Sequence, residues 1–115
     1  MRVLVCGGRA YSDREKLFKT LNDIHNSKKG IDIIICGAAK GADTLAIHWA
    51  MKNEVIIHAY PAQWSRLGNA AGPSVRLQML QTERPDRVLV FPGGEGTEDM
   101  RAKATMYGYD VKVIK

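Results

Sequence analysis

Three stretches of this chain repeat one pattern: an apolar run of strand length, a glycine-rich loop, and a segment with helical spacing. They cover residues 3–9, 33–43 and 88–100. The apolar runs are rich in β-branched residues and do not alternate with polar ones, which is typical of parallel strands buried on both faces. Glycines after such strands let the backbone approach a ligand closely. The pattern predicts a parallel sheet whose loops gather at its carboxyl edge, where open α/β sheets bind ligands.

Strands and helices are predicted to alternate along the chain. The strands are expected at residues 2–6, 31–36, 55–59, 87–91 and 109–114. The helices are expected after a capping-box pattern at residues 12–15, and at residues 43–52, 73–82 and 97–107. Strict alternation predicts a Rossmann-like, three-layer α/β/α fold with a five-stranded parallel sheet in the order 3-2-1-4-5. The loops after the first and fourth strands then face each other across the switch point.

The composition is that of an ordinary globular protein. With 115 residues, 45% hydrophobic and 25% charged, the chain is expected to form one domain over residues 1–115. No apolar run approaches the roughly 20 residues of a membrane span. The first predicted strand begins too early to leave room for a signal peptide. We therefore expect a cytoplasmic protein that does not interact with membranes.

The net charge of +5 favours an anionic partner. The 17 basic residues are scattered, with Lys28 and Lys29 the only adjacent pair, which argues against a nucleic-acid-binding face. Four basic residues lie in or beside loop motifs and are the candidate phosphate contacts: Arg9, Lys40, Arg66 and Arg76.

The third loop gives the strongest binding signal. It consists of Pro92, Gly93, Gly94, Glu95, Gly96 and Thr97. Its glycines leave backbone N–H groups open to an anion, and Thr97 is suited to cap the helix that follows. The next two acids, Glu98 and Asp99, either complement the helix dipole or accept hydrogen bonds from ribose hydroxyls.

The other two loops add candidate ligand contacts. These are Gly7, Gly8 and Arg9 in the first loop (residues 7–9), and Gly37, Lys40, Gly41 and Asp43 in the second loop (residues 37–43). A charged Arg9 beside a buried strand end needs an anionic partner. Asp43 either caps the second helix or reaches the crevice.

Cysteine, histidine and tryptophan give weaker signals. Cys6 and Cys36 each end a predicted strand, so they are either buried small side chains or neighbours at the crevice floor. Trp64 either plugs the core or stacks on a base. No Cys or His set has the spacing of metal ligands. We expect no metal, no cofactor and no catalytic residue.

Five motifs occur in order along nearly the whole chain: Gly7-Gly8-Arg9, residues 37–43, Ala62-Gln63-Trp64, Ala71-Gly72-Pro73 and residues 92–97. As an ordered set they resemble the SLOG superfamily of Rossmann-like proteins, which includes Smf/DprA and the "lonely guy" (LOG) phosphoribohydrolases. The closest likeness is to its small YspA/YAcAr-like branch, common in bacteria and phages. The resemblance implies glycine loops that cradle a nucleotide or nucleotide-derived ligand. It also implies a homodimer, for which a surface at Trp49 and Met51 or at Met79 is a candidate.

Two positions depart from that pattern. The phosphoribohydrolases follow the third loop with a pair of glutamates, the second of them catalytic, where this chain has Asp99 and Met100. A thioether cannot transfer a proton. The small branch also carries an arginine two residues after the Ala-Gly-Pro motif, whereas here Arg76 comes one residue later.

The favoured function is binding of a nucleotide-derived ligand, either to sense it or to sequester it. The main alternative is hydrolysis of an N-glycosidic bond, for which Glu95, Glu98 or Asp99 would supply the carboxylate. A third is an accessory role in DNA binding or processing, which the scattered basic residues disfavour.

Overall fold

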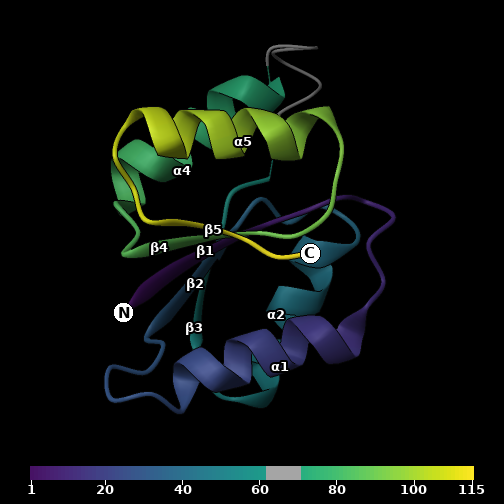
Figure 1. The fold of residues 1–115 in the computed structure, drawn as a ribbon, viewed down its shortest axis with the longest axis vertical. Helices are drawn as coiled ribbons and strands as arrows, with labels where there is room; N and C mark the ends of the chain where they lie inside the picture. The colour runs from purple at the N-terminus through teal and green to yellow at the C-terminus, as the bar shows by residue number, and fades with distance from the viewer. Residues whose placement is uncertain (62–70) are drawn as a thin grey trace.

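The computed structural model of the protein describes residues 1–61 and 71–115. Its centre is a five-stranded sheet of β1 (Arg2–Cys6), β2 (Ile33–Cys36), β3 (Ile56–Ala59), β4 (Arg87–Val90) and β5 (Val111–Val113). The strands lie in the order β3-β2-β1-β4-β5, and all neighbours are parallel (Figure 1). The predicted Rossmann-like fold and strand order are confirmed.

Helices cover both faces of the sheet. Helices α1 (Arg14–His25) and α2 (Ala42–Lys52) lie on one face, and α4 (Ala71–Glu83) and α5 (Glu95–Met106) lie on the other (Figure 1). Successive residues of β1 point to opposite faces. Val3 and Val5 therefore join the core beneath α1 and α2 with Trp49, whereas Leu4 joins the core beneath α4 and α5 with Met100.

Helix α1 begins one residue later than the capping-box pattern indicates. Leu17, Leu21 and Ile24 are buried. The N-cap is Asp13, whose side chain accepts a hydrogen bond from the Lys16 N–H at 3.1 Å. The capping box that starts at Ser12 is therefore wrong, because the carboxylate of Asp13 takes the capping position.

Every predicted strand except the first is shorter than expected, and two of them begin two residues late because a side chain or a helix end takes over a backbone N–H group. Strand β2 begins at Ile33 rather than Ile31, whose N–H donates to Nδ1 of His25 at 3.1 Å. Strand β5 begins at Val111 rather than Tyr109, whose N–H donates to the Ala104 carbonyl oxygen of α5 at 2.9 Å. Asp32 and Asp110 still form backbone hydrogen bonds, with the Met1 carbonyl oxygen and the Val88 N–H, so only Ile31 and Tyr109 lose their place in the ladder.

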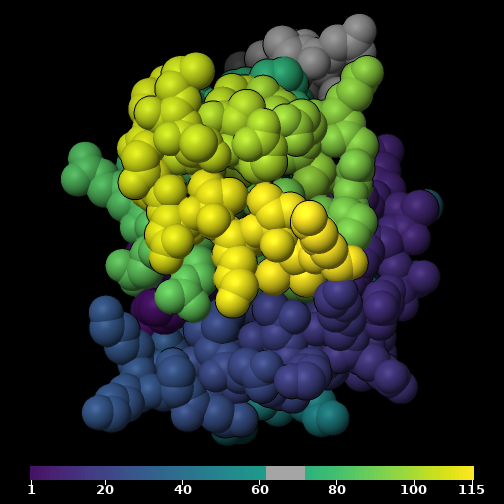
Figure 2. Space-filling model, in the orientation of Figure 1, coloured from purple at the N-terminus to yellow at the C-terminus, as the bar shows by residue number. Residues whose placement is uncertain are grey.

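Gly108 follows the end of helix α5 in the left-handed conformation, with φ +81, as is typical of a glycine after a helix. Tyr107 is the C-cap and is 55% exposed. Figure 2 shows α5 and the C-terminal strand covering the upper part of one face of the molecule, with α1 below them.

The apolar surfaces expected for a dimer are mostly internal. Trp49 is fully buried, and its indole N–H donates to the side-chain oxygen of Asn22 at 2.8 Å. Met79 is also buried, so of these candidates only Met51 lies on the surface. The dimer surfaces predicted at Trp49 and at Met79 are therefore wrong, because both side chains are buried within the protein.

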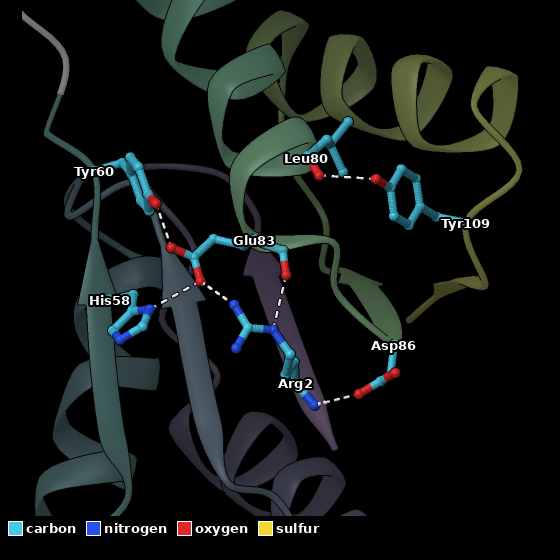
Figure 3. A network of polar contacts seen from close by, with 7 residues as sticks. All are labelled: Arg2, His58, Tyr60, Leu80, Glu83, Asp86 and Tyr109. Atoms are coloured by element: carbon cyan, nitrogen blue, oxygen red, sulfur yellow. Dashed lines mark hydrogen bonds and ion pairs between the residues drawn. The ribbon is translucent and has the colours of Figure 1, made fainter.

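A buried carboxylate ties the end of α4 to the sheet. Glu83, the last residue of α4, contacts Arg2 of β1, His58 of β3 and Tyr60 just after β3 (Figure 3). Burial raises the pKa of Glu83, but hydrogen bonds with Tyr60 and His58 outweigh that effect and lower the pKa overall. The network fixes α4 over β1 and β3, and so helps to position the start of α4 at the opposite end of the helix.

None of the helices in the described part of the chain is long and apolar enough to span a bilayer.

Candidate functional site

A pocket of about 1140 Å³ opens at the carboxyl ends of β1, β2 and β4. Ligand sites for small molecules are commonly about 300–1,000 Å³. Eleven of the sequence-predicted residues line it: Gly7, Gly8, Arg9, Gly37, Lys40, Asp43, Arg76, Gly94, Glu95, Gly96 and Thr97. The three loops therefore meet at one crevice. The predicted residues Gly41, Pro92, Gly93 and Glu98 are not part of the pocket wall.

The first and third loops touch through glycine. The Gly8 N–H donates to the Pro92 carbonyl oxygen at 2.9 Å. A Cβ added to Gly8 would lie 2.9 Å from the Cα of Gly93, and one added to Gly93 would lie 2.6 Å from the Gly8 nitrogen. These glycines are required for the loops to approach each other, so Gly93 shapes the pocket without lining it.

The second loop is held against the first in the same way. Gly41 has φ +79, and a Cβ there would lie 2.7 Å from the Arg9 carbonyl oxygen and still closer to that of Gly8. The N–H of Ala42, the first residue of α2, donates to the Gly8 carbonyl oxygen at 3.3 Å. Gly41, like Gly93, is therefore required for two loops to approach each other.

The start of α5 differs from the expectation that Thr97 caps it. The N-cap is Gly94, which makes no side-chain hydrogen bond, and Thr97 is the third residue of the helix and buried. The first hydrogen bond of the helix runs from the Glu98 N–H to the Gly94 carbonyl oxygen at 3.0 Å. The N–H groups of residues 95–97 therefore have no partner within the helix. A Cβ on Gly94 would meet no atom within 4 Å, so this end of the helix is open.

Arg76 lies between the first turns of α4 and α5. A Cβ added to Gly72 of α4 or to Gly96 of α5 would lie 3.0 Å from its Nη1. Its Nε donates to Oδ2 of Asp99 at 2.6 Å. The Lys103 ammonium donates to the same oxygen at 2.7 Å. Two cations thus share one carboxylate beside the pocket.

The two acids after the third loop have separate roles. Glu98 is exposed and pairs with Arg101, whose hydrogen bonds lower the pKa of Glu98. Asp99 lines the pocket. Partial burial raises the pKa of Asp99, but the hydrogen bonds from Lys103 and Arg76 outweigh it and lower the pKa overall.

Asp43 lies in the first turn of α2 and lines the pocket with its side chain 7% exposed. The N-cap of α2 is Gly41, so Asp43 does not cap that helix. Its Oδ2 accepts a hydrogen bond from the Ala39 N–H at 3.2 Å. Burial raises the pKa of Asp43 to about 6, although the backbone N–H groups of Ala39 and Gly37 act against this shift.

The basic residues of the rim are solvent-exposed. Arg9 and Lys40 both line the pocket with exposed side chains. The prediction that Arg9 needs an anionic partner assumed that its charge is shielded from water. Because the side chain is exposed, water can solvate the charge and that reason does not hold. Trp64 and Arg66 lie outside the described residues.

An apolar wall completes the pocket, and sequence reasoning missed it. Val75 and Met79 of α4 and Met100 of α5 line the pocket. They belong to the core beneath α4 and α5, where apolar residues at helical spacing usually pack. Nothing in the spacing shows that this core reaches the pocket.

The two thiols are unsuited to nucleophilic chemistry at neutral pH. Cys6 and Cys36 are free, and the Cys6 thiol donates to the Leu89 carbonyl oxygen at 3.6 Å. Burial raises the pKa of Cys6 to about 12 and that of Cys36 to about 11. In residues 1–61 and 71–115, no three His, Cys, Asp or Glu side chains gather as a metal site requires.

Comparison with known proteins agrees with this architecture. The chain aligns over 96% of its length with the Gene 61 protein of Mycobacterium phage D29, at 33% identity over 118 residues that cover 93% of the phage protein. Its fold matches DNA processing protein A (DprA) from Streptococcus pneumoniae with a TM-score of 0.74 and 21% identity. That match covers 99% of this chain and 50% of the DprA chain, so this chain spans about half the length of DprA. Residues 1–67 match the model of the YspA, cpYpsA-related SLOG family. With this fold, this family match and the phage relative, the chain belongs to the YspA, cpYpsA-related SLOG family.

Proposed function

We propose that this protein binds a nucleotide or nucleotide-derived ligand in the pocket and senses or sequesters it without turnover. Candidate ligands are a nucleoside monophosphate, an ADP-ribose-like compound or a signalling nucleotide. The observation that carries the proposal is the open first turn of α5, where N–H groups without helical partners lie beside the guanidinium of Arg76.

Electrostatics at this point favour an anion. The guanidinium of Arg76 lies against the first turns of two helices, which are their positive ends. In the described part of the chain, the carboxylate that contacts it belongs to Asp99 and is shared with Lys103. A phosphate here would be stabilised by the helix amides and by a guanidinium, which suits phosphate geometry well.

The apolar wall supports a ligand that is more than a phosphate. Val75, Met79 and Met100 line the pocket near this anion site. Thioether side chains pack well against aromatic rings. A nucleobase against this wall and a phosphate at α5 would use both parts of the pocket.

The carboxylates near α5 support binding rather than hydrolysis. Met100 is buried where the related phosphoribohydrolases carry a glutamate. The carboxylate of Asp99 already pairs with Arg76 and Lys103. Glu98 pairs with Arg101 and is not part of the pocket wall. Glu95 lies on the rim of the pocket and is exposed to solvent.

Isothermal titration calorimetry with AMP, ADP-ribose and NAD, and with adenosine as the uncharged control, tests the proposal. We expect at least one phosphorylated compound to bind with a dissociation constant below the millimolar range, and adenosine to bind much more weakly. Absence of binding across the panel would overturn the proposal. Chromatography after prolonged incubation should show no released base, and base release that disappears in Asp99→Asn or Glu95→Gln would establish the hydrolase instead.

A further inference from the structure

The pocket contains a buried carboxylate on the side opposite the open turn of α5. Asp43 follows β2, the third loop follows β4, and β1 lies between these two strands. Neighbouring strands are about 4.8 Å apart, so the ends of β2 and β4 are separated by about 10 Å. A phosphate at α5 would therefore not reach Asp43, whereas a phosphorylated sugar extends far enough to do so.

The chemistry of Asp43 selects what can lie next to it. A carboxylate repels a second phosphate and accepts hydrogen bonds from neutral hydroxyl groups. The backbone N–H of Ala39 donates to Oδ2 at 3.2 Å, and a backbone hydrogen bond from Gly37 also lowers the pKa of Asp43. Among the described residues, no side chain donates to this carboxylate. Burying a carboxylate in this position is costly unless a donor pairs with it.

We infer that Asp43 accepts hydrogen bonds from the hydroxyl groups of a phosphorylated sugar whose phosphate lies at the first turn of α5. This inference rests on the proposed function, and it makes Asp43 the residue that separates a ribose phosphate from its deoxy analogue and from phosphate alone. Asp43 is not involved in any covalent step.

Other groups around Asp43 do not offer the same contact. Cys6 and Cys36 are near it from β1 and β2, and their thiols remain protonated at neutral pH. The remaining charged groups of the pocket are Arg9, Lys40, Arg76, Glu95 and Asp99. The three basic residues are hydrogen-bond donors only, Asp99 is paired with Arg76 and Lys103, and Glu95 is exposed.

The test uses Asp43→Asn, because an asparagine oxygen can still accept the Ala39 N–H and keep the second loop in place. The matched control is Asp23→Asn, which removes a carboxylate from the exposed face of α1. Chemical-shift titrations with ribose 5-phosphate, 2-deoxyribose 5-phosphate and inorganic phosphate are recorded for the three proteins. Thermal melting of each protein verifies that the fold is intact.

We expect the wild-type protein and Asp23→Asn to prefer ribose 5-phosphate over its deoxy analogue about tenfold. Asp43→Asn should bind the two sugars equally and bind inorganic phosphate as well as the wild type or better. A preference for ribose that survives in Asp43→Asn would overturn the inference. If the wild-type protein binds a nucleotide but does not distinguish the two sugars, the inference fails and the proposed function stands. If neither nucleotides nor sugar phosphates bind, both fail.

Discussion

At the scale of single residues, the loop glycines fall into two kinds with different physical roles. Gly8, Gly41 and Gly93 lie where another backbone leaves no room for a Cβ. Gly94 faces open space at the start of α5 and has φ −100, which other residues adopt readily. Substitution should therefore separate the glycines that build the pocket from the one that keeps it accessible.

Replacing Gly94 and Gly93 by alanine gives the clearest comparison. Gly94→Ala should lower the free energy of unfolding by less than about 1 kcal/mol, because alanine is only a poorer N-cap than glycine. It should weaken ligand binding at least about tenfold, since its methyl group would extend into the pocket. Gly93→Ala should cost about 1–3 kcal/mol, because its Cβ meets backbone. Urea denaturation and calorimetry measure both, and equal stability losses for the two variants would contradict this division.

Asp43 is expected to reduce stability at neutral pH. Its pKa of about 6 in the folded protein lies above the ordinary value of 3.8, so the folded state binds the proton more tightly than the unfolded state. Stability attributable to Asp43 is thus present below pH 4 and is lost as the pH rises through 6. Asp43→Asn should stabilise the protein by about 1–3 kcal/mol at pH 7.5 and by little at pH 3.5. Urea denaturation at the two pH values tests this, and a destabilised variant at pH 7.5 would refute it.

At the scale of elements, the first turns of α4 and α5 act together through one arginine. Arg76 comes from α4, its carboxylate partner Asp99 comes from α5, and a glycine in each helix gives the guanidinium its place. Arg101 offers a natural comparison, since it pairs with Glu98 on the exposed side of α5. The two arginines differ mainly in whether they face the pocket.

Arg76→Ala should weaken binding of a phosphorylated ligand about tenfold or more, whereas Arg101→Ala should leave the affinity within about twofold. The reason is that charge-assisted hydrogen bonds to a phosphate are worth about 1.5–3 kcal/mol when partly buried. Calorimetry at two salt concentrations measures both variants. An equal loss in the two would mean that Arg76 acts only through the general positive field of the protein.

The network at the end of α4 should make the protein sensitive to acid. Glu83 has a lowered pKa in the folded state, so its stabilising contribution is present above the unfolded pKa of about 4.3 and is lost as the pH falls through the lower folded value. Glu83→Gln should cost about 1–3 kcal/mol at pH 7, because Arg2 loses its buried partner. The deficit should shrink toward pH 3. Urea denaturation across this range tests the expectation, with the exposed Glu54→Gln as control.

At the scale of the whole molecule, the sequence was sufficient for the strand order because alternating strands and helices leave few topologies. Element ends were less predictable. Asp13 displaced Ser12 as a cap, and His25 took the Ile31 N–H that the ladder would otherwise use. These outcomes depend on side chains competing for single backbone groups, and periodicity does not report such competition.

The site was predictable as a cluster of loops but not residue by residue. Parallel strands bring the three loops to one edge, so their convergence follows from topology. The role of each residue within the loops does not follow from topology. Gly93 and Gly94 are adjacent in sequence. Gly93 allows the first and third loops to approach each other, whereas Gly94 faces the pocket. Likewise, Asp99 turned toward Arg76 of another helix, a contact that no local pattern contains.

The central position of β1 has a consequence for how the chain folds. Of the five strands of the sheet, β1 comes first along the chain and its neighbour β4 comes fourth, with Val3 of one paired to Arg87 of the other. Until β4 is made, one edge of β1 has unpaired backbone groups, and the face with Leu4 lacks the cover of Val88 and Met100. Contacts so distant along the chain form late, because a long loop must close first. The topology that brings the first and third loops together therefore leaves that edge of β1 open to aggregation until β4 has been synthesised.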